Sequence, residues 1–450
     1  MRNDRIVVIG GVAAGMSAAA KAARVKPDAR ITVFTNEIYI SYGACGFPYF
    51  LAGEIENEAK LVARSIEQFR AQNIDVRVGH EVLKINPADK KVSVKKLGTV
   101  EEVDYDKLVI ATGASPFIPP VEGVNLRNVF VLRNMGHAME LKNYISREKP
   151  KNAVIVGGGY IGLEMAEMLL KLGCKVAIVE LAPQIVPNMD EDMAAILKEY
   201  LEKNGVEVFT AEKLMRIEGR EAVEKVVTDK RELVSEMVLL AVGTIPNSKL
   251  AEDAGIELGI RNAIKVNTRM ETSIPDIYAA GDCATVRHRL TGEDVYIPLG
   301  TTANKQGRVA GENAAGGNAE FAGVLGTGIA KVMNMEIART GLSARELQQH
   351  GIEYVETVIL ARTKAGYYPG SEKIYIKLIA GKQDGKLWGA QIVGGAGAGK
   401  RIDVFAACMH LGATVDAVQD MDLAYAPPFS PVYDAILVGL TDLQKKLKRV

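Results

Sequence analysis

The stretch RIVVIGGVAAG at residues 5–15 and the stretch AVIVGGGYIG at residues 153–162 decide the fold of this chain. Each is a short apolar run that stops at glycines, which is typical of a buried parallel strand that enters a tight turn. Each run is followed by a segment of helical character, at about residues 16–25 and 163–172. A second apolar strand completes a βαβ unit in both places, at residues 30–34 and 175–179. The sequence therefore predicts two Rossmann-like folds in one chain.

Two later strands indicate how these folds are arranged along the chain. Residues 106–113 and 237–243 each have the pattern of a strand that runs into a glycine turn and is followed by proline. They lie where the chain would leave the first and the second fold, so we interpret the second fold as inserted into the first. The expected domains are residues 1–115 together with 245–322, residues 116–244, and residues 323–450.

The C-terminal region has a different pattern. Apolar residues alternate from Ile374 to Leu378, Asp384-Gly385 forms a turn, and a second apolar run returns, which predicts a β-hairpin. Helices are expected at residues 401–411 and 433–447. In the second helix the apolar residues that recur at helical spacing are Ile436, Leu440, Leu443 and Leu447. We expect this stripe to dock on its own domain or on a twin subunit. The predicted fold class is α/β, with two dinucleotide-binding domains and a C-terminal α+β domain.

The composition excludes several classes of function. The chain has 450 residues, with 55 Lys and Arg against 55 Asp and Glu. A net charge of zero argues against nucleic acid or an anionic membrane as the main partner. No apolar run approaches the ~20 residues of a membrane helix, and the N-terminal apolar run is too short for a signal peptide. The four cysteines lie far apart, so we expect neither a disulfide scaffold nor a metal site. These features predict a cytoplasmic protein in which any special cysteine works singly.

The second glycine turn is a strong nucleotide signal. Gly157, Gly159 and Gly162 stand between a strand and a helix, where backbone N–H groups and the helix N-terminus approach a pyrophosphate. Glu180 ends the next strand. A carboxylate there accepts hydrogen bonds from the ribose hydroxyls and repels a 2′-phosphate. This pattern favours NADH over NADPH.

The first glycine turn is a weaker signal. Gly10 and Gly15 match the fingerprint, but Val12 occupies the position of its middle glycine. The next strand ends at Thr35 instead of an acid, with Glu37 two residues later. A later strand ends at Asp282, whose carboxylate either accepts hydrogen bonds from a polyol chain or caps a helix.

Together these motifs resemble the FAD-dependent pyridine-nucleotide disulfide oxidoreductases over nearly the whole chain. The resemblance implies a homodimer that binds FAD and NADH, in which Asp282 binds the flavin ribitol and Tyr160 lies over the flavin as a nicotinamide gate. Most of the superfamily has an acid at the place of Thr35, so the contact to the adenosine ribose would fall to Thr35 or Glu37. The cofactor-binding residues that the resemblance implies are Gly10, Gly11, Gly15, Thr35, Val82, Thr112, Gly113, Gly157, Gly159, Tyr160, Gly162, Glu180, Gly243, Gly281, Asp282, Leu299 and Thr302.

Cys45 indicates which branch of this superfamily the chain resembles. Dithiol members of the superfamily have a second cysteine nearby, whereas here position 50 is Phe50. The stretch YGACGFPY at residues 42–49 resembles the single-cysteine branch of coenzyme A-disulfide reductases, NADH oxidases, NADH peroxidases and polysulfide reductases. A lone cysteine is often a small buried hydrophobe, but flanking glycines favour a redox role for Cys45. For the other cysteines we expect packing roles; they are Cys174, Cys283 and Cys408.

Further residues point to one member of this branch. Peroxidases carry a histidine where this chain has Ala13, and the Phe47-Pro48-Tyr49 sequence is closer to the coenzyme A-disulfide reductases than to the water-forming oxidases. By the same resemblance, Tyr367 and Tyr425 reach from the partner subunit toward the active-site sulfur and donate protons to a leaving thiolate. The substrate-contact positions that match the family are Ser17, Lys21, Arg24, Ser41, Asn304 and Arg308.

The leading hypothesis is therefore an FAD enzyme that uses NADH to reduce a small disulfide, persulfide or polysulfide at Cys45, with coenzyme A disulfide as the best candidate. One alternative is an NADH oxidase in which Cys45 cycles through a sulfenic acid. Another is a redox-sensing flavoprotein with negligible turnover. The cofactor motifs are common to the reductase and the oxidase, so the sequence leaves the physiological acceptor open.

Overall fold

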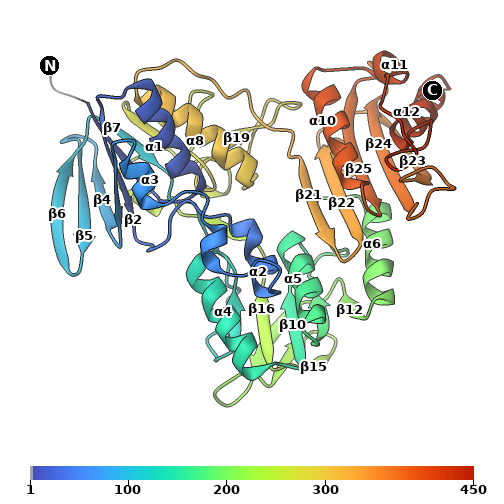
Figure 1. The fold of residues 1–450 in the computed structure, drawn as a ribbon, viewed down its shortest axis with the longest axis horizontal. Helices are drawn as coiled ribbons and strands as arrows, with labels where there is room; N and C mark the ends of the chain where they lie inside the picture. Colours follow the sequence, from blue (N-terminus) through green and yellow to red (C-terminus); the bar gives the residue numbers. More distant parts are fainter. Residues whose placement is uncertain (1–3, 450) are drawn as a thin grey trace. The chain divides into compact units, whose positions relative to one another are not determined.

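A computed structural model describes residues 4–449 (Figure 1). The chain divides into two compact units. Unit 1 comprises Met1–Phe117, Arg133–Met139 and Thr244–Val324. Unit 2 comprises Ile118–Leu132, Glu140–Gly243 and Leu325–Val450. This division is coarser than the three expected domains, whose boundaries stay a prediction. Within residues 4–449, no helix combines the length and the apolar composition that a membrane crossing requires.

Unit 1 is built on a parallel sheet of five strands in the order β18-β7-β1-β2-β3. Val8 at the centre of β1 lies opposite Val33 on one side and Val109 on the other, and its side chain is fully buried. Strands buried on both faces need such continuous apolar runs. The bounds are β1 Arg5–Ile9, β2 Arg30–Thr35, β3 Ile74–Val78, β7 Lys107–Ile110 and β18 Ile277–Ala279.

Two helices of unit 1, α1 (Ala13–Val25) and α8 (Gly300–Ala314), pack with their backbones in close approach, and Figure 1 shows them side by side. A Cβ atom on Gly307 would lie 2.3 Å from the carbonyl oxygen of Ala14, and one on Gly311 would lie 2.1 Å from that of Ala18. Small residues on both helices are therefore required. The sequence predicts that the first helix begins at Met16. It begins at Ala13, three residues earlier, because the glycine turn between β1 and α1 is shorter than predicted.

The remaining elements of unit 1 are short. An antiparallel meander of β4, β5 and β6 and a two-stranded ribbon of β8 with β17 form separate small sheets. Their bounds are β4 Glu81–Asn86, β5 Lys91–Lys96, β6 Thr99–Asp104, β8 Ala114–Pro116 and β17 Thr244–Pro246. The other elements are η1 Ala44–Gly46, α2 Phe47–Leu51, η2 Glu58–Leu61, α3 Ile66–Arg70, α7 Lys249–Asp253, η3 Ile260–Asn262, β19 Val286–Arg287 and β20 Asp294–Val295.

Unit 2 contains a second parallel sheet, in the order β12-β11-β10-β16-β9. The βαβ unit predicted from the second glycine run is present as β10 (Asn152–Val156), α5 (Tyr160–Lys171) and β11 (Lys175–Val179). Here too the helix begins three residues before the predicted start, directly after Gly159. The other bounds are β9 Val129–Val131, α4 Met135–Glu148, α6 Glu191–Lys203, β12 Val206–Phe209, β13 Leu214–Glu218, β14 Lys225–Thr228, β15 Glu232–Val234 and β16 Met237–Leu240.

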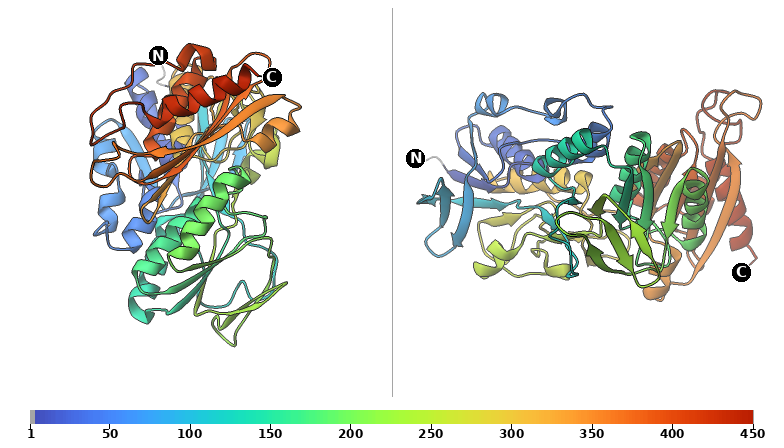
Figure 2. Two further views of the ribbon diagram at one scale, coloured as in Figure 1. Left: turned by 90° about the vertical axis from the view of Figure 1, so that its right-hand side faces the viewer. Right: turned by 90° about the horizontal axis from the view of Figure 1, so that it is seen from below.

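The C-terminal part of unit 2 is an antiparallel sheet, in the order β21-β22-β25-β24-β23 (Figure 2). The predicted hairpin forms β24 and β25, and the fold class predicted from the sequence is confirmed. The bounds are β21 Gly328–Val332, β22 Met335–Gly341, α9 Ala344–Gln349, β23 Tyr354–Arg362, β24 Lys373–Gly381, β25 Leu387–Gly394, η4 Gly399–Arg401, α10 Ile402–His410, α11 Val415–Val418 and α12 Ala435–Leu447.

The last helix, α12, docks on this sheet through its predicted stripe. Leu440 and Leu443 are fully buried, and Gly439 lies against Leu378 of β24 and Ile359 of β23. The helix begins at Ala435, two residues later than predicted, because the Asp434 carboxylate caps its N-terminus by accepting a hydrogen bond from the N–H of Ile436 at 2.9 Å. The stripe therefore contributes to the core of its own domain.

Truncating this stripe should destabilise the protein. Leu440→Ala leaves a cavity between α12 and the sheet, so we expect the free energy of unfolding to fall by about 2–5 kcal/mol. Urea denaturation measures this change. Leu411→Ala is the matched control, because the Leu411 side chain is 82% exposed and its loss should cost about 0.5 kcal/mol or less. Equal losses in the two variants would contradict the packing described for α12.

Candidate functional site

The first glycine turn of unit 1 has the geometry of a phosphate cradle. Gly10 has φ +118°, and a Cβ atom there would lie 2.1 Å from the carbonyl oxygen of Ala111. A Cβ atom on Gly15 would lie 2.0 Å from the carbonyl oxygen of Gly10, so α1 starts directly against the turn. Val12 at the N-cap has no side-chain acceptor, and the first turn of α1 contains no acid. The first N–H groups of α1 therefore fit an anion such as a pyrophosphate.

The second glycine turn, in unit 2, repeats this geometry. Gly157 has φ +109°, and a Cβ atom on Gly162 would lie 2.1 Å from its carbonyl oxygen. Helix α5 likewise begins without a side-chain cap at Gly159 and without an acid in its first turn. Gly243 has φ +108° and follows β16, the strand that lies next to β10. A second dinucleotide fits this turn.

Glu180 is fixed beside the second turn. Its two carboxylate oxygens accept hydrogen bonds from the N–H groups of Gly158 and Ala182, each at 2.7 Å, and its side chain is buried. A carboxylate oxygen has more than one lone pair, so both oxygens can still accept hydrogen bonds from hydroxyl groups. The carboxylate is therefore held at the end of β11, where the fingerprint expects a ribose.

The end of β2 in unit 1 differs from the fingerprint. The Thr35 hydroxyl accepts a hydrogen bond from the N–H of Glu37 at 3.3 Å, and the Glu37 carboxylate accepts one from the Tyr42 hydroxyl at 2.7 Å. Burial raises the pKa of the Glu37 carboxyl above its ordinary value. The N–H of His80 donates to the Thr35 carbonyl at 2.9 Å, which brings Val82 of β4 near this strand end. Thr35 and Glu37 are the two residues that could replace the acid usually found at the end of β2. The Glu37 carboxylate already accepts a hydrogen bond from Tyr42.

Asp282 forms an ion pair that the sequence did not indicate. Its carboxylate lies 2.6 Å from the Arg133 guanidinium, which also donates to the carbonyl oxygen of Ala114 at 2.9 Å. Asp282 lies in a turn after Gly281 and begins no helix, so the alternative role as a helix cap does not apply. Because Arg133 is 149 residues distant in the sequence, no spacing motif could have identified it.

Other residues predicted to bind a cofactor lie at the ends of neighbouring elements of unit 1. The Thr112 hydroxyl donates to the carbonyl oxygen of Asn247 at 2.6 Å, and the Gly113 carbonyl accepts the N–H of Asn247 at 2.9 Å. Leu299 is the N-cap of α8, and Thr302 is buried in its first turn. The apolar Leu299 side chain cannot cap α8, so this helix also begins with N–H groups that suit a polar ligand.

Cys45 lies in the short helix η1 at the start of a buried aromatic segment. The N–H of Ser41 donates to the carbonyl oxygen of Gly11 at 2.8 Å, which ties the segment to the first glycine turn. The Tyr42 ring packs on Phe47 with ring centroids 5.8 Å apart, and both side chains are buried. Cys45 itself is exposed. The other three cysteines are buried, and burial raises the pKa of each of their thiols: Cys174, Cys283 and Cys408.

The close packing of α1 on α8 also brings together most of the predicted substrate residues. Asn304 donates to the Ser17 hydroxyl at 2.9 Å, and the Lys21 ammonium lies 2.8 Å from the Glu312 carboxylate. Arg24 is exposed and lies one turn further along α1. A pocket of about 240 Å³ between the two helices is lined by Lys21, Lys305, Arg308, Val309, Glu312 and Phe321. Lys305, a third cation in this lining, was missed from the sequence.

The two predicted tyrosines lie together in unit 2. The hydroxyls of Tyr367 and Tyr425 are 3.5 Å apart, and their side chains are 77% and 44% exposed. The hydrogen bond with Tyr367 raises the pKa of Tyr425, so the Tyr425 hydroxyl keeps its proton at neutral pH.

Two side chains lie on the first turns of α5. Tyr160 is its first residue, and the Tyr160 hydroxyl accepts a hydrogen bond from the Asn188 amide at 3.4 Å. Glu164, one helical turn later, was missed from the sequence. Burial, and then the neighbouring Glu167 carboxylate, raise the pKa of Glu164 to about 7. The sequence feature that could have identified Glu164 is its spacing of four residues from Tyr160, which puts both side chains on one face of the helix.

Comparisons with known proteins agree with these two nucleotide folds. The family model of the pyridine nucleotide-disulphide oxidoreductases matches residues 4–307, and the model of their dimerisation domain matches residues 328–435. An NADH oxidase of Methanocaldococcus jannaschii is 40% identical over 446 residues, which are 98% of this chain and 99% of that protein. An NAD(P)H coenzyme A polysulfide/persulfide reductase of Pyrococcus horikoshii is 40% identical over 436 residues, 96% of this chain and 97% of that protein.

A solved structure is similar over the full chain. The reduced CoADR-RHD of Bacillus anthracis has a TM-score of 0.97 and 36% identity, and the match covers 100% of this chain and 81% of that one. The two glycine turns, the sheets that hold them and these matches lead to one assignment. The chain belongs to the pyridine nucleotide-disulphide oxidoreductase family and is an NAD(P)H-dependent flavoprotein oxidoreductase.

Proposed function

We propose that this chain uses NADH to reduce a small disulfide or persulfide of coenzyme A, with Cys45 as its redox-active thiol. One observation carries the proposal. Unit 1 contains both the exposed Cys45 and a pocket whose charged lining is three cations, Lys21, Lys305 and Arg308, against the single acid Glu312, whereas the other three cysteines are buried. Coenzyme A carries phosphates on a long arm that ends in sulfur, so a basic pocket and an accessible thiol are what its recognition requires.

The cofactor-binding residues divide between the two units. In unit 1 the first turn of α1 would hold the FAD pyrophosphate, with Asp282 and Arg133 offering polar contacts to the rest of the molecule. In unit 2 the first turn of α5 and the Glu180 carboxylate would hold the dinucleotide. Because a 2′-phosphate would meet the Glu180 carboxylate, NADH is preferred over NADPH. Bound FAD supplies two-electron transfer from reduced nicotinamide to sulfur.

The chemistry of this chain centres on Cys45. Its thiolate attacks one sulfur of the substrate, the S–S bond breaks, and the other half leaves as a thiolate while a mixed disulfide forms. Two electrons and a proton then release the second thiol and return Cys45 to the thiolate. Only a deprotonated, accessible sulfur can make this attack, which excludes the buried cysteines.

The tyrosine pair has the chemistry to protonate the leaving group. The two hydroxyls are adjacent and both side chains are exposed. The pKa of Tyr425 is raised by its hydrogen bond with Tyr367, so the Tyr425 hydroxyl keeps a proton that it can donate to a departing thiolate. The dimerisation domain in the family match supports a homodimer in which the pair acts on the Cys45 of the other subunit.

The alternative function of an NADH oxidase is supported by one observation. The relative from Methanocaldococcus jannaschii is named an NADH oxidase. In that reaction oxygen is the acceptor and Cys45 cycles through a sulfenic acid. A third candidate, a redox sensor, would bind the cofactors and keep Cys45 as a mixed disulfide without turnover. The reductase, the oxidase and the sensor differ in the electron acceptor that they use and in the rate at which they oxidise NADH.

The primary test is anaerobic NADH oxidation by the purified yellow protein with coenzyme A disulfide as sole acceptor. We expect two thiols for each NADH oxidised, since one disulfide takes up two electrons. Cys45→Ser should lose this turnover, and the control Cys408→Ala should keep it, because Cys408 is buried. Turnover that starts only when air is admitted would establish the oxidase, and no bleaching of the flavin by NADH would establish the sensor.

The basic pocket is tested by comparing two substrates. The double variant Lys21→Ala with Arg308→Ala should raise the KM for coenzyme A disulfide about 10-fold, because charged hydrogen bonds to phosphate are lost. The KM for pantethine, the same disulfide arm without the nucleotide phosphates, should stay unchanged. Lys96→Ala is the matched control, since Lys96 is an exposed lysine of β5. Equal effects on the two substrates would contradict phosphate binding at this pocket.

The raised pKa of Glu164 predicts a pH dependence of nicotinamide binding. Glu164 shares a face of α5 with Tyr160, the proposed nicotinamide gate, so the proposal places its carboxylate beside the bound ring. Reduced nicotinamide is neutral and oxidised nicotinamide is a cation, so a carboxylate there favours NAD⁺ over NADH. With a pKa of about 7, Glu164 is mostly neutral at pH 6 and mostly ionised at pH 8. The ratio of the Kd for NADH to that for NAD⁺ should therefore rise about 3- to 10-fold between these pH values. Fluorescence titration measures both constants. In Glu164→Gln the ratio should not vary with pH, and the same rise in that variant would refute the assignment.

A further inference from the structure

The segment that follows Glu180 is held against the second glycine turn. Val186 has φ +47°, a left-handed conformation that a β-branched residue rarely adopts, and its side chain is buried. Its N–H donates to the carbonyl oxygen of Gly158 at 2.9 Å. Such a conformation persists only where the surroundings fix it.

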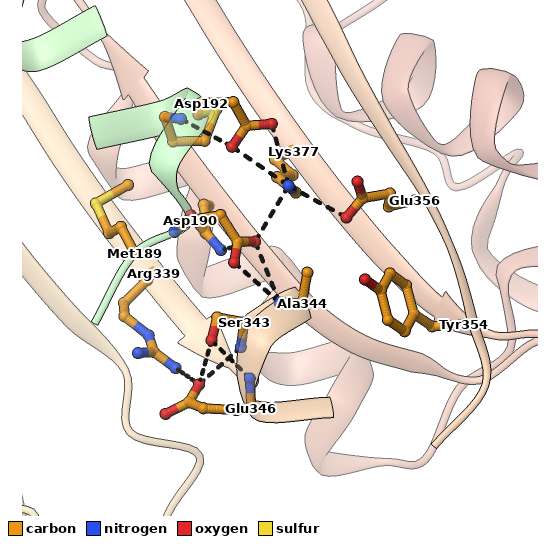
Figure 3. Close-up of polar contacts among 12 residues, drawn as sticks. Met189, Asp190, Asp192, Arg339, Ser343, Ala344, Glu346, Tyr354, Glu356 and Lys377 are labelled. Atoms are coloured by element: carbon orange, nitrogen blue, oxygen red, sulfur yellow. Dashed lines mark hydrogen bonds and ion pairs between the residues drawn. The ribbon is translucent and has the colours of Figure 1, made fainter. Parts of the chain in front are cut away.

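The far end of this segment, Asp190, is anchored in the C-terminal sheet (Figure 3). Its carboxylate is 8% exposed and accepts hydrogen bonds from the N–H of Ala344 at 3.0 Å and from the Gln391 amide at 2.7 Å. The ammonium of Lys377, 3% exposed, lies 3.2 Å from the same carboxylate and 3.0 and 3.1 Å from those of Asp192 and Glu356. Lys377 and Asp190 are both buried, and separating a buried ion pair leaves an uncompensated charge, so this pair holds Asp190 in place.

Two arginines of the same domain hold the backbone between these ends. Arg345 donates to the carbonyl oxygen of Pro187 at 2.8 Å. The buried Arg339 donates to the carbonyl oxygen of Asn188, and it is held by the Gly341 carbonyl at 2.6 Å and the Glu346 carboxylate at 2.9 Å. The backbone of Asn188 is therefore positioned independently of its own side chain.

The Asn188 side chain reaches Tyr160. Its amide donates to the Tyr160 hydroxyl at 3.4 Å. On the other side, a Cβ atom on Gly328 would lie 3.4 Å from the Tyr160 ring and its hydroxyl, which is van der Waals distance, so the first residue of β21 lies close to the ring. The C-terminal domain thus contacts Tyr160 directly through Gly328 and holds the residue that bonds to its hydroxyl.

We propose that Asn188 is a positioning residue that fixes Tyr160, and that the C-terminal domain sets the nicotinamide gate by clamping the 186–190 segment. The inference rests on the proposed role of Tyr160 as the gate. A gate must leave its fixed position before nicotinamide binds, so the bond from Asn188 is part of the cost of NADH binding.

The test is the Kd for NADH of Asn188→Ala, measured on the FAD-loaded protein by fluorescence titration. Loss of one such hydrogen bond should lower this Kd about 3- to 10-fold. The substitution leaves the carbonyl that Arg339 holds, so FAD content and the melting temperature should match the wild type. Gln348→Ala is the matched control, because it removes another amide donor to a tyrosine hydroxyl, that of Tyr354, and should leave the Kd unchanged.

A double-variant comparison separates positioning from a general structural effect. In a Tyr160→Phe background the hydroxyl is gone, so Asn188→Ala should change the Kd no further. The same change in both backgrounds, a rise in Kd, or no change in the wild-type background would overturn the inference. Failure of the proposed function has a different signature, which is that NADH binds but coenzyme A disulfide is not reduced by the wild type.

Discussion

The approach of a helix N-terminus to the carboxyl end of a parallel strand is the constraint on which this structure depends. It occurs twice, at Gly15 against Gly10 and at Gly162 against Gly157, with Cβ positions only 2.0 and 2.1 Å from a carbonyl oxygen. A side chain at either place would push the helix away from the turn. Because the helices start there without caps, each turn presents N–H groups that an anionic dinucleotide can satisfy. The remaining elements of both units are arranged around these turns.

A second close approach, of α1 to α8, shapes the pocket that we propose for the substrate. The small residues of α1 allow α8 to pack backbone against backbone, and this contact brings Lys21 of α1 near Lys305 and Arg308 of α8. The same packing therefore stabilises the core and creates a basic pocket. Burial distinguishes the cysteines, since it raises the pKa of three thiols, whereas Cys45, the proposed redox-active residue, is exposed. Both features support the proposal that the substrate is a phosphate-bearing thiol such as coenzyme A.

The C-terminal domain contributes more than an interface. Its buried Lys377 and Arg339 hold the segment that carries Asn188, and that residue bonds to Tyr160. A buried charge network is costly unless every partner is in place, so it couples the position of this segment to the integrity of the sheet. The domain that carries the tyrosine pair thus also restrains Tyr160, the proposed nicotinamide gate.

Features with a short spacing were predictable from the sequence alone. Both βαβ units, the C-terminal hairpin and the stripe of α12 follow from periodicity and glycine positions, because local backbone preferences decide them. The sequence by itself thus determined two nucleotide folds and a candidate thiol. Only the tertiary structure paired Arg133 with Asp282, added Lys305 to the basic pocket and brought Asn188 to Tyr160. The physical reason is that such contacts depend on how distant elements pack, and packing leaves no fixed spacing in the chain.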